Sequence, residues 1–394
     1  MWDIIRKKTI LSLFKLSHSY NGYIKGLNGG TQLKKNAKSF IPFAAIATIL
    51  LISYILQKVP KTYGSDDSVN VYQKFQSGQP IQYLVIGDSI GRGSGAENPS
   101  LTWFKQLEHK MNDKDDSRLH GDYVVQSGST AFEGLFKLSQ RREHEHKDLI
   151  FIVFGENDRK YMSVDDFTMT YEALIRKAKH LHPHAELFTI TESSLKQDEF
   201  AAAIARLSDH YGATNVDMRP VFKNSGYTEK QLTKDLVHPN GLGYRFYANA
   251  IYDRFHDNVK REKSVAALPS KLHAHAELEL SVIEHYEKMK GFRPKGGYYT
   301  SSEKGSVIDY QFNGSILGVK LLRSPDGGEV KVWIDGNEVT TLNTWWPFAR
   351  ERYIYVTNGL PPGPHTVRFE VAGRIKAFDQ DTIPYVRIAS IITD

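Results

Sequence analysis

Between residue 80 and about residue 260, short apolar runs alternate with longer stretches in which apolar residues recur at helical spacing. The short runs predict buried strands and the longer stretches predict amphipathic helices, because the patterns match the periods of these elements. The predicted strands are Ile81–Ile86, Tyr123–Gln126, Leu149–Phe154, Leu187–Thr191 and Asn215–Met218, and the clearest helices are Leu101–Met111, Val164–His180 and Phe200–Tyr211. Strands that alternate with helices form a parallel sheet. Residues 80–260 are therefore predicted to be an α/β domain with a flavodoxin-like three-layer arrangement.

After residue 276 the pattern changes to short segments in which every second residue is apolar. Ile308, Tyr310 and Phe312 form one such segment, and residues 330–334 and 367–371 form two more. Turn sequences such as Asp326-Gly327-Gly328 separate them. This pattern predicts an all-β sandwich domain, residues 276–394, of which residues 276–286 fit a strand or a helix. Residues 58–79 and 261–275 are polar or charged and are predicted to be linkers.

Residues 40–56 (FIPFAAIATILLISYIL) form a stretch without a charged side chain. Its length is at the lower end of the roughly 17–25 residues with which a helix spans a bilayer. A core helix would alternate with polar residues, and a cleaved signal peptide would have a shorter apolar core and a small-residue cleavage site. The sequence therefore predicts an uncleaved transmembrane anchor, residues 39–57, as the contact with the membrane.

Most of the excess positive charge precedes this stretch. The formal net charge is +6, but residues 1–38 alone contain eight Lys or Arg and one acidic residue, Asp3. The rest of the chain is close to neutral, so we expect no nucleic acid as a partner. The positive-inside rule predicts that residues 1–38 are a basic cytoplasmic tail and that the chain after residue 57 is extracytoplasmic. The tail itself fits an amphipathic helix on an anionic membrane surface or a disordered segment.

The first predicted strand ends in Gly87-Asp88-Ser89. A glycine at this point permits a tight turn that presents the next side chain at the carboxyl edge of the sheet, where ligands of open α/β sheets bind. Ser89 is therefore a candidate nucleophile, although a lone serine there is more often a turn or N-cap residue. A serine nucleophile also needs a base, a group that orients the base, and an oxyanion hole.

Asp235 and His238 can supply the base and the group that orients it. In a loop, their spacing lets the carboxylate accept the Nδ1–H of the histidine, which leaves Nε2 free to take the proton of Ser89. Pro239 stiffens this loop. The alternative interpretation is a helix-capping aspartate beside an exposed histidine.

Gly128 and Asn157 follow the second and third predicted strands and are candidates for the oxyanion hole. A glycine lets its backbone N–H approach a substrate closely, and the amide of an asparagine side chain can donate to an oxyanion. Each could also be an ordinary turn residue. Their position at successive strand ends of the domain that contains Ser89 favours a common site.

Together these segments resemble the SGNH (GDSL-type) hydrolase family. Its four sequence blocks occur in order as Gly87-Asp88-Ser89, Gly128, Gly155-Glu156-Asn157-Asp158 and Asp235-Leu236-Val237-His238-Pro239. The resemblance covers about residues 80–255. It implies an SGNH hydrolase domain with Ser89 as nucleophile, His238 as base and Asp235 as its orienting group. The implied oxyanion hole consists of the N–H groups of Ser89 and Gly128 and the side chain of Asn157.

Two positions depart from the family pattern. Arg92 lies close to the serine, where it either favours an anionic substrate or is solvated. The asparagine that often precedes the glycine of the second block is missing, and Gln126 stands nearby instead. These departures affect the expected shape of the pocket and leave the predicted triad complete.

We expect no cofactor and no metal. The chain has no cysteine, which excludes thiolate metal sites and a cysteine nucleophile. Gly91–Ala96 matches a dinucleotide-binding pattern, but this motif should start at the strand end and open a helix, and three residues intervene here. The histidines at 144, 146, 180, 182 and 184 lie in polar stretches without an HExxH pattern.

These observations favour an extracytoplasmic serine esterase that removes small acyl groups, acetyl above all, from a polysaccharide. An O-acyltransferase with the same triad and a non-catalytic glycan-binding protein are the alternatives. The complete set of candidate residues argues against the last. The segment Trp345-Trp346-Pro347-Phe348 could stack on sugar rings or seal the sandwich. The sequence does not indicate the oligomeric state.

Overall fold

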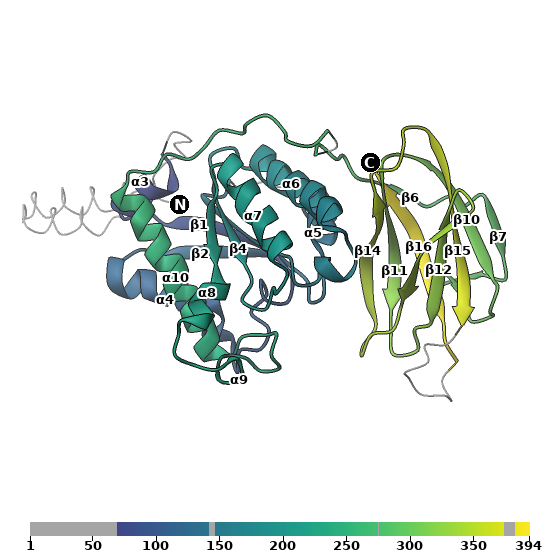
Figure 1. The fold of residues 1–394 in the computed structure, drawn as a ribbon, viewed down its shortest axis with the longest axis horizontal. Helices are drawn as coiled ribbons and strands as arrows, with labels where there is room; N and C mark the ends of the chain where they lie inside the picture. Colours follow the sequence, from purple (N-terminus) through teal and green to yellow (C-terminus); the bar gives the residue numbers. More distant parts are fainter. Residues whose placement is uncertain (1–68, 142–145, 275, 374–382) are drawn as a thin grey trace, which may run out of the picture. The chain divides into compact units, whose positions relative to one another are not determined.

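A computed structural model of the protein describes residues 69–141, 146–274, 276–373 and 383–394 (Figure 1). Residues 67–394 form one compact unit. The predicted tail and the predicted membrane span, residues 40–56, lie outside the described residues. Among the helices that are described, none is both long and apolar enough to cross a membrane.

The first part of this unit is a five-stranded parallel sheet, as predicted. Its strands stand in the order β2-β1-β3-β4-β5. They are β1 (Ile81–Gly87), β2 (Leu119–Val125), β3 (Leu149–Val153), β4 (Glu186–Thr191) and β5 (Thr214–Asp217). Gly87 lies opposite Val125 on one side and Val153 on the other. The carboxyl ends of the three strands that precede Ser89, Gly128 and Asn157 therefore meet at one edge.

Helices cover both faces of this sheet and give the three-layer arrangement (Figure 1). One face carries α4 (Trp103–Asp115), α8 (Met218–Lys223) and α10 (Gly241–Lys260), and the other carries α5 (Ala131–Ser139), α6 (Val164–Leu181) and α7 (Asp198–His210). A short helix, α9 (Glu229–Leu232), precedes the histidine loop. The predicted helices occur within a few residues of their expected bounds.

The predicted linker of residues 58–79 needs one correction, because residues Val71–Gln76 form a helix, α3. Asn70 caps this helix, because its side chain accepts hydrogen bonds from the N–H groups of Tyr72 and Gln73. The side-chain oxygen of Gln73 in turn accepts the N–H of Asn70. Val71 and Tyr72 are buried against the α/β core. This capping box is visible in the sequence as Asn-x-x-Gln.

The C-terminal part consists of two antiparallel sheets packed around a common apolar core. One sheet has the order β13-β12-β15-β10-β7 and the other β14-β11-β16-β9-β8, with β6 paired to β16. The strands are β6 (Ser281–Ile283), β7 (Lys288–Lys290), β8 (Arg293–Lys295), β9 (Tyr298–Ser301), β10 (Val307–Asn313), β11 (Ile316–Arg323), β12 (Glu329–Ile334), β13 (Asn337–Asn343), β14 (Arg350–Asn358), β15 (Pro364–Gly373) and β16 (Val386–Thr393). The ambiguous segment 276–286 contributes only the short strand β6.

The outer face of the β14–β11–β16 sheet does not face solvent throughout, because α5 packs on it. The ring of Phe132 lies 6.0 Å from that of Tyr355, and Phe136 lies 4.5 Å from Tyr353. One hydrophobic cluster accordingly contains residues of the α/β helices together with Ile316, Tyr355 and Ile392 from the C-terminal strands. The two parts of residues 67–394 therefore share a core.

Candidate active site

Ser89 sits in a tightly bonded turn directly after β1. The side chain of Asp88 accepts the N–H of Ile90 at 2.7 Å, and the indole of Trp103 donates to the Ile90 carbonyl at 3.1 Å. Ser89 is only 6% exposed. The turn therefore holds the serine hydroxyl at the carboxyl edge of the sheet, as the position of Gly87 predicted.

The histidine loop lies directly against this turn. His238 Nε2 is 2.9 Å from the Ser89 hydroxyl oxygen, and His238 Nδ1 is 2.7 Å from a carboxylate oxygen of Asp235. The other carboxylate oxygen of Asp235 accepts the backbone N–H groups of Val237 and His238, at 3.1 and 2.8 Å. Leu236, at the tip of the loop, has φ 68°. This left-handed conformation is energetically unfavourable for any residue other than glycine. The aspartate thus fixes both the ring and the backbone of the histidine.

The glycines that follow Ser89 have a steric role in this arrangement. A Cβ atom on Gly95 would lie 2.5 Å from the Pro239 carbonyl oxygen and 2.9 Å from His238 Cβ. Tyr244 donates its hydroxyl to the Ser94 carbonyl at 2.6 Å and holds the loop in place. The glycine run that imitates a dinucleotide motif therefore allows the serine loop and the histidine loop to pack together.

Gly128 lies at the end of β2, next to the serine turn. Gln126 N–H and the Ser129 hydroxyl both donate to the Gly87 carbonyl, at 3.1 and 3.3 Å. Gly128 has φ 73°, a conformation that glycine adopts without the penalty of a side chain. The structure thus brings the predicted oxyanion glycine beside the predicted nucleophile.

Asn157 follows β3, and its side chain points to the same turn. Asn157 Nδ2 donates one hydrogen to Asp88 at 2.7 Å, which leaves its second N–H available for a substrate oxygen. Asp158 accepts the N–H of Gly155 at 3.1 Å and that of Ala131 at 2.7 Å, so it ties the end of β3 to the start of α5. All five predicted site residues, Ser89, Gly128, Asn157, Asp235 and His238, are therefore held by neighbouring turns at one edge of the sheet.

Residues 85–246 match the family model described as the GDSL-like lipase/acylhydrolase family. This part of the chain is therefore similar to that family in sequence. The protein is accordingly an ester hydrolase of the serine type. No functionally curated protein matches the chain.

Residues 85–246, which we call the acylhydrolase region, and the sheets that follow them have a counterpart among solved structures. A two-domain esterase described as active on acetylated mannans has 19% identical residues and a TM-score of 0.64, and the match covers 82% of this chain and 93% of that one. The structure of that esterase co-crystallised with mannopentaose gives the same values. A match of this extent reaches beyond residues 85–246 and shows that the fold is shared in both parts.

Buried carboxyl groups lie beneath the acylhydrolase site, and the sequence patterns did not reveal them as a group. Burial raises the pKa of Asp88 to about 6, although the N–H groups of Ile90 and Gly91 lower it. Burial likewise raises the pKa of Asp158 to about 7 and holds the pKa of Glu192 well above its usual range. Asp88 and Glu192 also repel one another. This cluster therefore keeps protons to a higher pH than exposed carboxyl groups do.

The C-terminal part contributes residues to the rim of the acylhydrolase site. Arg350 donates to the side-chain oxygen of Gln126 at 2.8 Å, so Gln126, the departure from the family pattern, has a partner in a distant strand. Trp346 lies close to Gly128, whereas Phe348 is 48% exposed. Arg92 is exposed and donates to the Ser127 hydroxyl at 3.3 Å. Trp346 therefore borders the site.

Of the histidines outside the triad that were considered as metal ligands, His144 lies outside the described residues. No group of three His, Cys, Asp or Glu suited to a metal ion occurs in the part of the chain that the structure describes. His182 is buried, which lowers its pKa to about 4, and its Nδ1 accepts the N–H of Lys147 at 3.3 Å. This histidine is a neutral core residue.

Proposed function

We propose that the protein is a carbohydrate esterase that removes small acyl groups, acetyl in particular, from a polysaccharide, with Ser89, His238 and Asp235 as its triad. The observation that carries this proposal is the hydrogen-bonded series from Ser89 to His238 to Asp235, with distances of 2.9 and 2.7 Å. The two-domain esterase of the same fold acts on acetylated mannans, which supports an acylated carbohydrate as the substrate class.

In the proposed reaction, His238 Nε2 takes the hydroxyl proton while Ser89 Oγ attacks the acyl carbon. The N–H groups of Ser89 and Gly128 and the free N–H of Asn157 stabilise the oxyanion that forms. The imidazolium, stabilised by Asp235, then gives its proton to the departing sugar oxygen, and the acyl group remains on Ser89. A water molecule, deprotonated by His238, attacks this acyl-enzyme and releases the carboxylic acid and free serine.

The substrate class predicts which esters are cleaved. We expect acetate release from acetylated mannan or xylan and from p-nitrophenyl acetate, with a steep decline for p-nitrophenyl esters of long acyl chains. Acetate can be quantified after incubation with each polymer, and the same polymers after alkaline deacetylation are the control. Preference for long-chain esters would contradict the proposal of a carbohydrate deacetylase.

Hydrolysis and acyl transfer share the acyl-enzyme and differ only in the acceptor. With mannopentaose added to the p-nitrophenyl acetate reaction, a hydrolase releases acetate in proportion to p-nitrophenol. Acetylated oligosaccharide as the main product, detected by mass spectrometry, would instead assign the protein to the O-acyltransferases.

We also propose that residues 40–56 anchor the protein in the cell membrane, with its catalytic region outside the cytoplasm. The lack of charge in this stretch supports a membrane span. The lysines before it support the proposed orientation. The full chain should remain in the membrane pellet after a carbonate wash, and protease added to spheroplasts should digest the catalytic region. A variant that lacks residues 1–66 is the matched control and should be soluble. Recovery of the full chain in the soluble fraction would contradict the anchor.

A further inference from the structure

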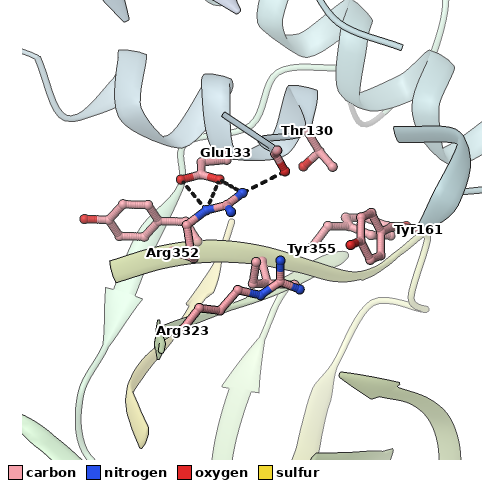
Figure 2. A pocket seen from close by; sticks show the side chains of 9 residues that line it. Thr130, Glu133, Tyr161, Arg323, Arg352 and Tyr355 are labelled. Atoms are coloured by element: carbon pink, nitrogen blue, oxygen red, sulfur yellow. Dashed lines mark hydrogen bonds and ion pairs between the residues drawn. The ribbon is translucent and has the colours of Figure 1, made fainter. Parts of the chain in front are cut away.

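A fully buried ion pair joins the C-terminal sheet to the acylhydrolase region. Arg352 on β14 donates from Nε and Nη2 to one carboxylate oxygen of Glu133 on α5, at 3.0 and 2.8 Å. Both side chains are 1% exposed. Figure 2 shows the two groups in direct contact between the helix and the strand, where both line a pocket.

Burial of such a pair removes two charges from water. The attraction between the charges often does not offset the free-energy cost of this desolvation. Lys137 adds a second cation to Glu133 at 2.9 Å, so the carboxylate is fully compensated. Apolar side chains would fill this interface at lower cost, as Phe132 and Phe136 do nearby. A structural contact alone therefore does not explain why a guanidinium stands at this point.

The third contact of Arg352 indicates what the guanidinium does. Its Nη2 also donates to the carbonyl oxygen of Gly128, at 2.7 Å. Its Nη1, which has no hydrogen-bond partner within the described part of the chain, lies 3.5 Å from the point that a Cβ on Gly128 would occupy. Trp346 Cη2 is 3.1 Å from the same point, and its ring lies 5.6 Å from the guanidinium. Arg352 and Trp346 thus support Gly128 directly from the C-terminal part.

Gly128 needs such support because a glycine backbone rotates more freely than that of any other residue. Its N–H has to point at an oxyanion, and preorganised donors owe their effect to being fixed before the reaction. The bond to the Gly128 carbonyl restricts rotation about the glycine, and Glu133 in turn fixes the guanidinium that makes this bond.

We propose that Arg352 is a positioning residue for the oxyanion donor Gly128, so that the C-terminal sheets complete the catalytic site of the acylhydrolase region. This inference rests on the proposed function, in which Gly128 binds the oxyanion. It extends that function by making turnover of even the smallest ester depend on a residue 224 positions away from Gly128 in the sequence.

The test compares Arg352→Lys and Arg352→Met with wild type on p-nitrophenyl acetate. Lysine keeps the charge beside Glu133 but lacks the fork that reaches both Glu133 and Gly128. Because a misplacement of about 1 Å can lower a rate about 10²-fold, we expect kcat to fall roughly 10- to 100-fold with KM within about threefold. Attack of Ser89 on a phosphonate also builds up negative charge on an oxygen that the oxyanion donors can bind. Labelling of Ser89 by a phosphonate should therefore slow by a similar factor, while the pH profile of kcat/KM keeps its shape.

Two reference variants separate positioning from stability. Asn157→Ala removes an oxyanion donor completely. Its expected loss of kcat, about 10²–10³-fold, is the upper limit for the loss in the Arg352 variants. Arg368→Met removes an arginine of the other C-terminal sheet that makes two bonds to Asp309, at 2.8 and 2.9 Å, and should leave kcat unchanged. Melting curves of all variants fix an assay temperature at which each is folded.

A folded Arg352→Lys variant with kcat and labelling rate within twofold of wild type would overturn this inference. Arg352→Met can fail to fold, and the lysine variant then decides. If wild type itself neither hydrolyses the ester nor is labelled at Ser89, the proposed function is wrong and this inference falls with it. The wild-type arm therefore distinguishes the two failures.

Discussion

The Ser89→Ala variant is expected to lose ester hydrolysis by a factor on the order of 10⁶ in kcat, the loss seen when the serine or histidine of a comparable triad is removed. Without Oγ no acyl-enzyme forms, and only general binding and the oxyanion hole remain. The expected effect on stability is small, because the substitution removes one hydroxyl whose described partner is His238. Initial rates with p-nitrophenyl acetate and a melting curve measure the two effects separately.

His238→Ala and the double variant provide the control for this result. Groups that act as one unit lose activity to similar extents, and their losses do not add. We therefore expect His238→Ala and Ser89→Ala/His238→Ala to match the serine variant within about tenfold. A serine-directed phosphonate should label Ser89 in wild type and no residue in the serine variant. Wild-type turnover by a folded Ser89→Ala protein would disprove the proposed mechanism.

Asp235→Asn is expected to lower kcat by about 10⁴ without unfolding the loop. The asparagine oxygen can still accept the N–H groups of Val237 and His238, which now bond to one carboxylate oxygen. Its NH₂ group then faces His238 Nδ1 and donates to it. The ring proton has to move to Nε2, where it points at Ser89 and prevents the histidine from acting as a base.

A matched variant distinguishes this tautomer effect from loss of the loop. Partial burial raises the pKa of Asp235, but the bonds from His238 and Val237 outweigh this effect and hold the pKa below its usual range. Asp235 is therefore charged throughout the neutral range. Asp235→Ala removes the backbone bonds as well and should lower the melting temperature, whereas Asp235→Asn should not. If Asp235→Ala and Asp235→Asn had the same melting temperature and both lost only a little kcat, Asp235 would not orient the base.

The candidate site could be predicted from the sequence because each of its parts is local. A strand followed by a glycine fixes where Ser89 stands, and the three-residue spacing of Asp235 and His238 fixes a turn that the structure confirms in its bonds. The parallel sheet then brings the strand ends together without further information. The same logic placed Gly128 and Asn157.

The support of the site by the C-terminal part could not be predicted in this way. Glu133 and Arg352 are 219 positions apart, and neither stands in a sequence pattern that indicates burial of a charge. A charged residue in an apolar helix or an alternating strand is usually assigned to the solvent face. Helix α3 was missed for a different reason, because its six residues are too few to show a helical period.

The shared hydrophobic cluster limits how this enzyme can have evolved and how it can be engineered. A module that keeps its own closed core can be exchanged by recombination at a linker, as binding modules often are. Here Phe132 and Tyr355 belong to one cluster, and a foreign sheet would leave α5 with an unmatched apolar face and Glu133 without Arg352. Substitutions on α5 and β14 have to be compatible with one another, so chimeras should exchange residues 67–394 as one piece.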